Sequence, residues 1–109
     1  MKAVIAVDIG TTSLRATLYD EAGRALHSCQ RHNPPDYLDD GRVEQDPQSW
    51  LAHVRTVLRS AGQAVRDQGL EAACIAVTAQ RSSLIAVGAT GAPLHPAILW
   101  QDTRCAALA

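Results

Sequence analysis

An apolar strand that runs directly into a carboxylate, a glycine and three hydroxyl residues limits most strongly what this chain can fold into. Residues 4–7 form a short, uninterrupted apolar run, which is typical of a strand buried on both faces. Asp8 follows at the end of this strand, and Gly10 lets the backbone turn tightly beside a ligand. Residues 14–19 alternate apolar and polar side chains, which predicts a half-buried second strand. The sequence therefore predicts a hairpin, whereas a Walker-type phosphate loop opens a helix.

The turn of this hairpin has the composition of a phosphate and metal site. Backbone amides of the turn and the hydroxyls of Thr11, Thr12 and Ser13 can donate hydrogen bonds to phosphate oxygens. Asp8 supplies the hard carboxylate oxygen that Mg²⁺ prefers, directly or through water. The same residues are compatible with an ordinary polar hairpin turn, because glycine and hydroxyl residues are common in turns. Composition alone leaves both interpretations open.

A helix and a further strand are predicted after the hairpin. Residues 25–31 are predicted as a third strand, which completes an antiparallel three-stranded meander. Asp46 is a suitable N-cap and Pro47 fits the first helical position, so we expect a helix there that runs to Gln68. The apolar face of this helix is predicted to hold Trp50, Leu51, Val54, Val57, Leu58, Ala61, Ala64 and Val65.

The remaining segments complete an α/β topology. Residues 32–44 contain prolines and a glycine and are predicted as a loop. Residues 72–77 form a second apolar strand, and the helical crossover before it should place it parallel to the first strand. A further hairpin is expected from strands at 84–87 and 97–100, and residues 106–109 resemble the start of a helix.

The turn after this parallel strand is a second candidate site. Ligands gather beyond the carboxyl ends of parallel strands, so this turn should lie beside the turn that follows Asp8. It carries Gln80, Arg81 and Ser82. We expect Asp8 and Arg81 to lie at the same edge of the sheet.

Charge and composition exclude several classes of partner. The 10 basic and 11 acidic residues give a net charge of −1, without the basic footprint of a nucleic-acid-binding protein. No apolar run approaches the roughly 20 residues of a transmembrane helix, and no signal-peptide core follows Met1. Three cysteines and four histidines are scattered without the spacing of a disulfide framework or a zinc site. We expect a cytoplasmic protein with a small-molecule partner and neither nucleic acid nor membrane.

Four motifs resemble those of the FGGY carbohydrate kinases, which belong to the superfamily of actin, Hsp70 and sugar kinase ATPases. They are residues 8–15, 43–47 with Trp50, 78–81 and 96–104, in the family's order, and together they cover nearly the whole chain. The resemblance implies a partial ribonuclease H-like, actin-like ATPase fold. It also implies that residues 1–109 are the N-terminal portion of the family's N-terminal domain, with the second half of that domain and the C-terminal domain absent.

The resemblance further implies an ATP-dependent kinase that transfers the γ-phosphate to a hydroxyl of a sugar or polyol, with Mg²⁺. It assigns Asp8 to the metal. Arg15 is implied to face the phosphoryl group, although an arginine on a strand is at least as often a surface side chain. The implied phosphate-binding residues are Gly10, Thr11, Thr12, Ser13 and Arg15.

The second turn and the last motif are implied to bind the acceptor. Glycerol kinases carry Gln-Arg-Glu at this turn and xylulose kinases carry Gln-Met-His, whereas this chain has Gln80, Arg81 and Ser82. A polar group left unpaired in a site costs about 1–3 kcal/mol, so the missing carboxylate predicts an acceptor other than glycerol. Trp100 and Asp102 also lie on the substrate side in relatives, although we interpret Trp100 mainly as a packing residue because it closes an apolar strand.

Other parts of the catalytic machinery are expected outside this sequence. The family's catalytic base and adenosine loops are expected beyond Ala109, so the chain alone is predicted to be inactive. Its sheet should leave apolar surface uncovered, which is compatible with a homo-oligomer. The alternatives are a non-catalytic actin-like or Hsp70-like nucleotide switch or assembly module, and a structural oligomerisation fragment. The motif at 43–50 is interpreted as helix capping and packing.

Overall fold

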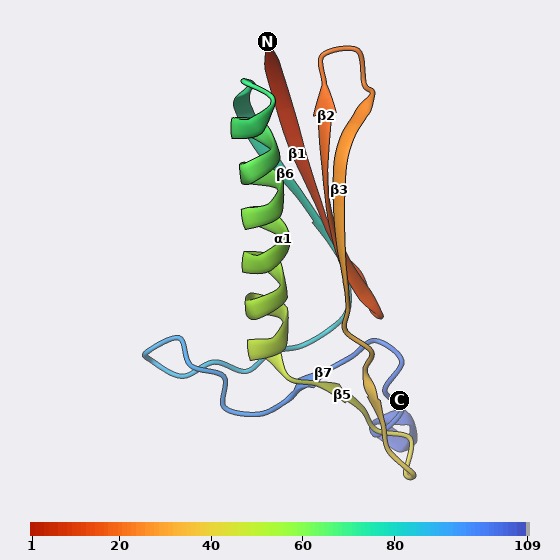
Figure 1. Cartoon of the computed structure of the whole chain (residues 1–109). Coiled ribbons are helices and arrows are strands. Elements are labelled where there is room, and N and C mark those ends of the chain that lie inside the picture. Colours follow the sequence, from red (N-terminus) through yellow and green to blue (C-terminus); the bar gives the residue numbers. More distant parts are fainter. Residues whose placement is uncertain (109) are drawn as a thin grey trace.

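A four-stranded mixed sheet with one long helix against it forms the main part of the molecule, which measures 54 × 29 × 20 Å (Figure 1). This computed structural model describes residues 1–108. The strands of the large sheet lie in the order β3-β2-β1-β6, and a smaller sheet has the order β4-β5-β7. The bounds are β1 (Lys2–Ile9), β2 (Ser13–Asp20), β3 (Ala25–His32), β4 (Asp36–Tyr37), β5 (Val43–Gln45), α1 (Pro47–Asp67), β6 (Glu71–Ala79), β7 (Ala97–Ile98) and a 3₁₀ turn, η1 (Ala106–Leu108).

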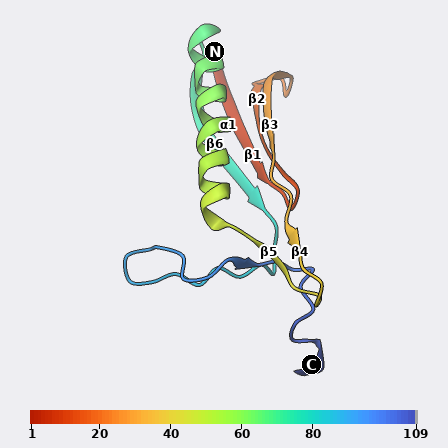
Figure 2. The same ribbon diagram turned by 60° about the horizontal axis from the view of Figure 1, so that its bottom comes forward.

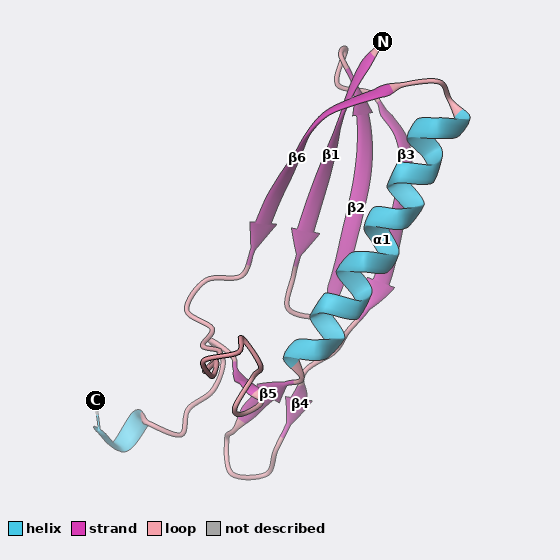
Figure 3. Ribbon diagram, turned by 90° about the vertical axis from the view of Figure 1, so that its left-hand side faces the viewer, coloured by secondary structure: helices cyan, strands magenta, loops and turns pink. Residues whose placement is uncertain are grey.

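The strand directions follow the predicted topology. Strands β1, β2 and β3 form an antiparallel meander, in which Asp8 lies opposite Arg15. Helix α1 then carries the chain back so that β6 pairs in parallel with β1, with Thr78 beside Asp8 (Figure 3). The predicted meander, crossover helix and parallel fourth strand are therefore confirmed.

Helix α1 begins and ends where local signals predicted. The Asp46 carboxylate accepts a hydrogen bond from the Gln48 amide at 2.9 Å, and Pro47 occupies the first turn. After the helix, Gly69 has a φ of +63°, in the left-handed region that favours glycine. The prediction that Leu51 belongs to the apolar face is wrong. This residue is 45% exposed, because it falls at the margin of the apolar stripe.

The core lies between α1 and one face of the sheet. Alternate residues of β1 and β2 face the helix, so Ile5, Val7, Ala16 and Leu18 are buried against it. The prediction that residues 4–7 are buried on both faces is wrong, because within the described chain a helix covers only one face. The buried helix residues are Val57, Ala61, Ala64 and Val65.

Strand β6 is one of the two edge strands of the large sheet, with β3 at the other edge, and all nine residues of β6 are exposed. Helix α1 packs mainly over β2 and β3, which leaves β6 uncovered. The apolar side chains of Ile75 and Val77 are 53% and 64% exposed. The predicted strand at 72–77 is present and longer than expected.

The segments outside the large sheet differ from the sequence predictions. The predicted loop at 32–44 contains β4 and enters β5, which pairs with β7. The expected hairpin after residue 83 is reduced to two isolated bridges on an arm that extends away from the sheet (Figure 2). Pro93 and Pro96 lack the N–H groups that a continuous ladder needs.

At the C-terminal end, the predicted helix start corresponds to the single 3₁₀ turn η1; Ala109 lies outside the described residues. Within residues 1–108, no helix is both long and apolar enough to cross a membrane.

Candidate functional site

The turn between β1 and β2 is closed by its own backbone. The Gly10 amide donates a hydrogen bond to the Ser13 carbonyl at 2.9 Å. A Cβ atom on Gly10 would lie 3.0 Å from that same oxygen, so a larger residue would force the turn to shift. Asp8 is exposed at the end of β1, and within residues 1–108 its carboxylate has no ion-pair partner. A carboxylate in this state is available to a cation.

The turn after β6 lies directly beside this first turn. The Gln80 amide donates to the Ile9 carbonyl at 3.3 Å, which continues the parallel pairing past the end of both strands. Asp8 and the Gln80–Arg81 turn therefore lie at the same edge of the sheet, as the topology predicted.

Two serines shape the second turn. Ser82 has a φ of +63°, an unusual conformation for a residue other than glycine, and such strain is often found at functional sites. The Ser83 hydroxyl donates to the Gln80 side-chain oxygen at 2.9 Å and accepts from the Trp100 amide at 3.2 Å. Ser83 thus joins the second turn to the segment after β7, a role that the sequence did not suggest.

An open hollow of about 610 Å³ forms beside this turn. Four predicted acceptor residues, Gln80, Arg81, Ser82 and Trp100, line it together with Ala79. Trp100 is 56% exposed, so the interpretation of this side chain as a packing residue is wrong. Its indole nitrogen donates to the Thr11 hydroxyl oxygen at 3.1 Å, which links the hollow to the first turn.

Arg15 lies on the exposed side of β2, next to the first turn. Its guanidinium donates to the Gln30 side-chain oxygen at 2.8 Å, and the Gln30 amide nitrogen donates to the Ser13 hydroxyl at 3.1 Å. Gln30 was not predicted. It lies opposite Arg15 in the register of β2 and β3, a position that becomes visible only once that register is known.

Asp102 is not brought to the hollow. Its carboxylate accepts from the Val43 amide at 2.7 Å and from the Arg104 guanidinium at 2.7 and 2.9 Å, and Arg104 also binds Glu44. The hydrogen bonds from Arg104 hold the pKa of Asp102 well below its ordinary value, and those same contacts raise the pKa of Arg104. In this geometry Asp102 holds β5 through hydrogen bonds, in place of the predicted contact with the acceptor.

The motif at 43–50 also reaches the first turn. Gln45 is buried, and its side-chain amide donates to the carbonyl of Asn33. The Asn33 amide in turn donates to the Thr12 carbonyl at 2.8 Å. Neither contact had a sequence signal, because both depend on where a loop returns to the sheet.

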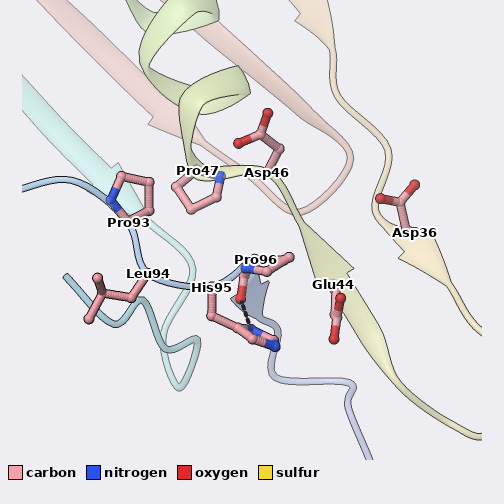
Figure 4. Close-up of a pocket in the computed structure, with 8 residues that line it drawn as sticks. All are labelled: Asp36, Glu44, Asp46, Pro47, Pro93, Leu94, His95 and Pro96. Atoms are coloured by element: carbon pink, nitrogen blue, oxygen red, sulfur yellow. Dashed lines mark hydrogen bonds between the residues drawn. The ribbon is translucent and has the colours of Figure 1, made fainter. Parts of the chain in front are cut away.

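A second hollow, of about 370 Å³, lies between the start of α1 and the arm (Figure 4). Asp36, Glu44 and Asp46 line it with His95, whose ring nitrogen contacts the Pro96 carbonyl at 2.7 Å. It contains none of the predicted site residues. Within residues 1–108, no three acidic, histidine or cysteine side chains are grouped to hold a metal, so Asp8 could contribute only one of several ligands.

The sheet order, with an antiparallel hairpin at the start of the chain and a parallel strand returned beside it by a helix, is that of the actin-like ATPase fold. Within that class, this chain belongs to the FGGY family of carbohydrate kinases: the model of the family's N-terminal domain matches residues 3–109.

Individual relatives agree with this assignment. The chain is 43% identical to a glycerol kinase from Rhodospirillum centenum over 97% of its length, and 33% identical to a xylulose kinase from Lactococcus lactis over 95%. A crystal structure of Plasmodium falciparum glycerol kinase with ADP matches 99% of the chain with a TM-score of 0.91 and 29% identity. The chain spans about a fifth of each of these proteins, 22%, 21% and 22% respectively. The predicted fold class is confirmed.

Proposed function

We propose that this chain carries the phosphate turn and part of the acceptor site of an ATP-dependent carbohydrate kinase. The proposed reaction transfers the γ-phosphoryl group of ATP to a hydroxyl of a sugar or polyol. The observation that carries the proposal is the parallel pairing of β1 with β6, which brings the Asp8 turn and the Gln80–Arg81 turn to one edge. Phosphoryl transfer needs a phosphate site and an acceptor site in this relation.

The first turn fits a nucleotide phosphate with its metal ion. Asp8 offers a carboxylate without an ion-pair partner among residues 1–108, and Gly10 keeps the backbone free of a Cβ that would crowd the turn. Mg²⁺ at this position would neutralise charge on the phosphates. In the proposed site Thr11, Thr12 and Ser13 donate to phosphate oxygens, and Arg15 stays beside them through Gln30.

The hollow beside the second turn is the proposed acceptor site. Arg81 is exposed there and can donate to acceptor hydroxyls, while the Trp100 ring offers an apolar face to the carbon skeleton. Ser82 stands where glycerol kinases carry an acidic residue. We therefore propose an acceptor that does not need a carboxylate at this position to bind its second pair of hydroxyls.

The remainder of the active site is proposed to come from the rest of the protein. Residues 1–109 would form the first part of the N-terminal domain, and the catalytic base and adenosine site would lie in the part of the family's length that this chain does not span. A cytoplasmic location, where ATP is produced, fits this proposal.

A coupled assay on the full-length protein tests the proposed function. ADP formation should depend on one acceptor among glycerol, pentuloses, hexuloses and polyols, and should fall sharply in Asp8→Ala. ADP formation that no acceptor stimulates would contradict the kinase proposal and favour the nucleotide-switch alternative.

A further inference from the structure

Trp100 contacts both halves of the proposed site. Its side chain lines the acceptor hollow, and its indole nitrogen lies 3.1 Å from the Thr11 hydroxyl oxygen, although 89 positions separate the two residues. We infer that Trp100 is a positioning residue for the phosphate turn: it orients the Thr11 hydroxyl toward ATP and thereby couples the binding of acceptor and nucleotide. This inference rests on the proposed kinase function.

The chemistry of the two groups fixes the direction of this hydrogen bond. An indole N–H can only donate, whereas a threonine hydroxyl both donates and accepts. Thr11 must therefore accept from Trp100, which leaves its own proton to be donated elsewhere. The proton of Thr11 is then available to a phosphate oxygen, the acceptor that the first turn is proposed to bind.

The backbone of Trp100 is held independently of its ring. Its amide donates a hydrogen bond to the Ser83 hydroxyl at 3.2 Å. The preceding residue, Leu99, is buried, and its amide donates a hydrogen bond to the Val43 carbonyl at 3.0 Å. The ring itself is largely exposed. Within residues 1–108, the indole nitrogen has one hydrogen-bond partner, the Thr11 hydroxyl, and Trp100 also lines the hollow.

An acceptor that packs on this ring would act on the Thr11 hydrogen bond. If the acceptor favours the ring position that donates to Thr11, it also favours the hydroxyl orientation that binds phosphate. Coupling between two ligands is reciprocal, so ATP would raise acceptor affinity by the same factor. One hydrogen bond between neutral groups supports a coupling of about threefold to tenfold.

The test measures the Kd of MgATP for the full-length protein, with and without saturating acceptor. Trp100→Phe keeps an aromatic face and removes the N–H, and Thr11→Val keeps the side-chain shape and removes the hydroxyl. Thr11→Ser is the matched control because it keeps the hydroxyl. The double variant Trp100→Phe/Thr11→Val completes a double-mutant cycle.

We expect Trp100→Phe and Thr11→Val each to raise the Kd of MgATP by about threefold to tenfold, with the double variant no weaker than Thr11→Val. Thr11→Ser should stay close to wild type, and Trp100→Phe should reduce the effect of acceptor on ATP affinity. Effects that multiply in the double variant, or an unchanged Kd in Trp100→Phe, would overturn the inference. Failure of the kinase proposal is a separate result, recognised by wild-type protein that binds MgATP without acceptor-dependent turnover.

Discussion

Asp8 lies at the end of β1 and Arg81 follows the neighbouring parallel strand β6, yet the proposed reaction gives them different ligands. Asp8 serves the metal and the phosphates, so Asp8→Ala should lower kcat of the full-length kinase by about 100-fold with little change in acceptor KM. Arg81 faces the acceptor hollow. Arg81→Ala should raise acceptor KM by the factor that corresponds to a loss of about 1.5–3 kcal/mol in binding free energy, the range for hydrogen bonds that involve a charge.

Steady-state kinetics with acceptor and ATP varied separately distinguish these two effects. Arg81→Lys is the control, because it keeps the charge and loses the planar fork of donors. If both alanine variants changed acceptor KM equally, the proposed division between the two turns would be wrong.

Asp102 gives the protein a specific response to acid. Its pKa is lowered by hydrogen bonds from Arg104 and from the Val43 amide, so the folded state binds its proton less readily than the unfolded state, where the ordinary value is 3.8. This contribution to stability is complete above the unfolded pKa and is lost as pH falls through the lowered folded pKa. Asp102→Asn should therefore lower the unfolding midpoint at neutral pH, and the midpoints of variant and wild type should converge at acid pH. A difference between the two midpoints that stays constant across the whole pH range would contradict this account.

At the scale of single elements, the start of α1 depends on one side chain. The Asp46 carboxylate binds the Gln48 amide, so Asp46→Ala should cost about 1 kcal/mol and speed hydrogen exchange of the first-turn amides. Asp46→Asn keeps an acceptor and should preserve most of this protection. Unchanged exchange at Gln48 in the alanine variant would show that Pro47 and packing suffice to start the helix.

The elements that sequence predicted well are those with local signals. Alternation in β2, the Asp46–Pro47 start of α1 and the apolar run of β6 are each encoded by neighbouring residues. The pairing of β5 with β7 was missed because it depends on backbone groups about 50 positions apart, held in place by Asp102 and Arg104.

The site residues likewise divide into those with a local sequence signal and those without one. Gly10 and Arg81 were identified as candidates from the turns that hold them, whereas Gln30, Asn33 and Ser83 depend on long-range register or loop packing. Trp100 was misinterpreted because it follows an apolar strand, where burial is the ordinary expectation. Ala97 and Leu99 are buried, whereas Trp100, two residues after the end of β7, is exposed.

At the scale of the whole molecule, the large sheet has two edge strands, β3 and β6, and β6 is the more apolar of the two. Strand β6 is hydrogen-bonded to β1 on one side, and no strand of residues 1–108 pairs with its other side. It presents nine exposed residues, and only Glu71 among them is charged. Long apolar edges without charge or proline readily pair with another strand.

The 109-residue chain on its own should therefore associate with increasing concentration through β6. Val77→Lys places a charge on this edge and should shift sedimentation toward the monomer. Val87→Lys is the matched control, because Val87 is 58% exposed on the arm, compared with 64% for Val77. If Val87→Lys prevented association to the same extent as Val77→Lys, the association would be a nonspecific hydrophobic contact. If the chain stayed monomeric at all concentrations, the β6 edge alone would not drive pairing.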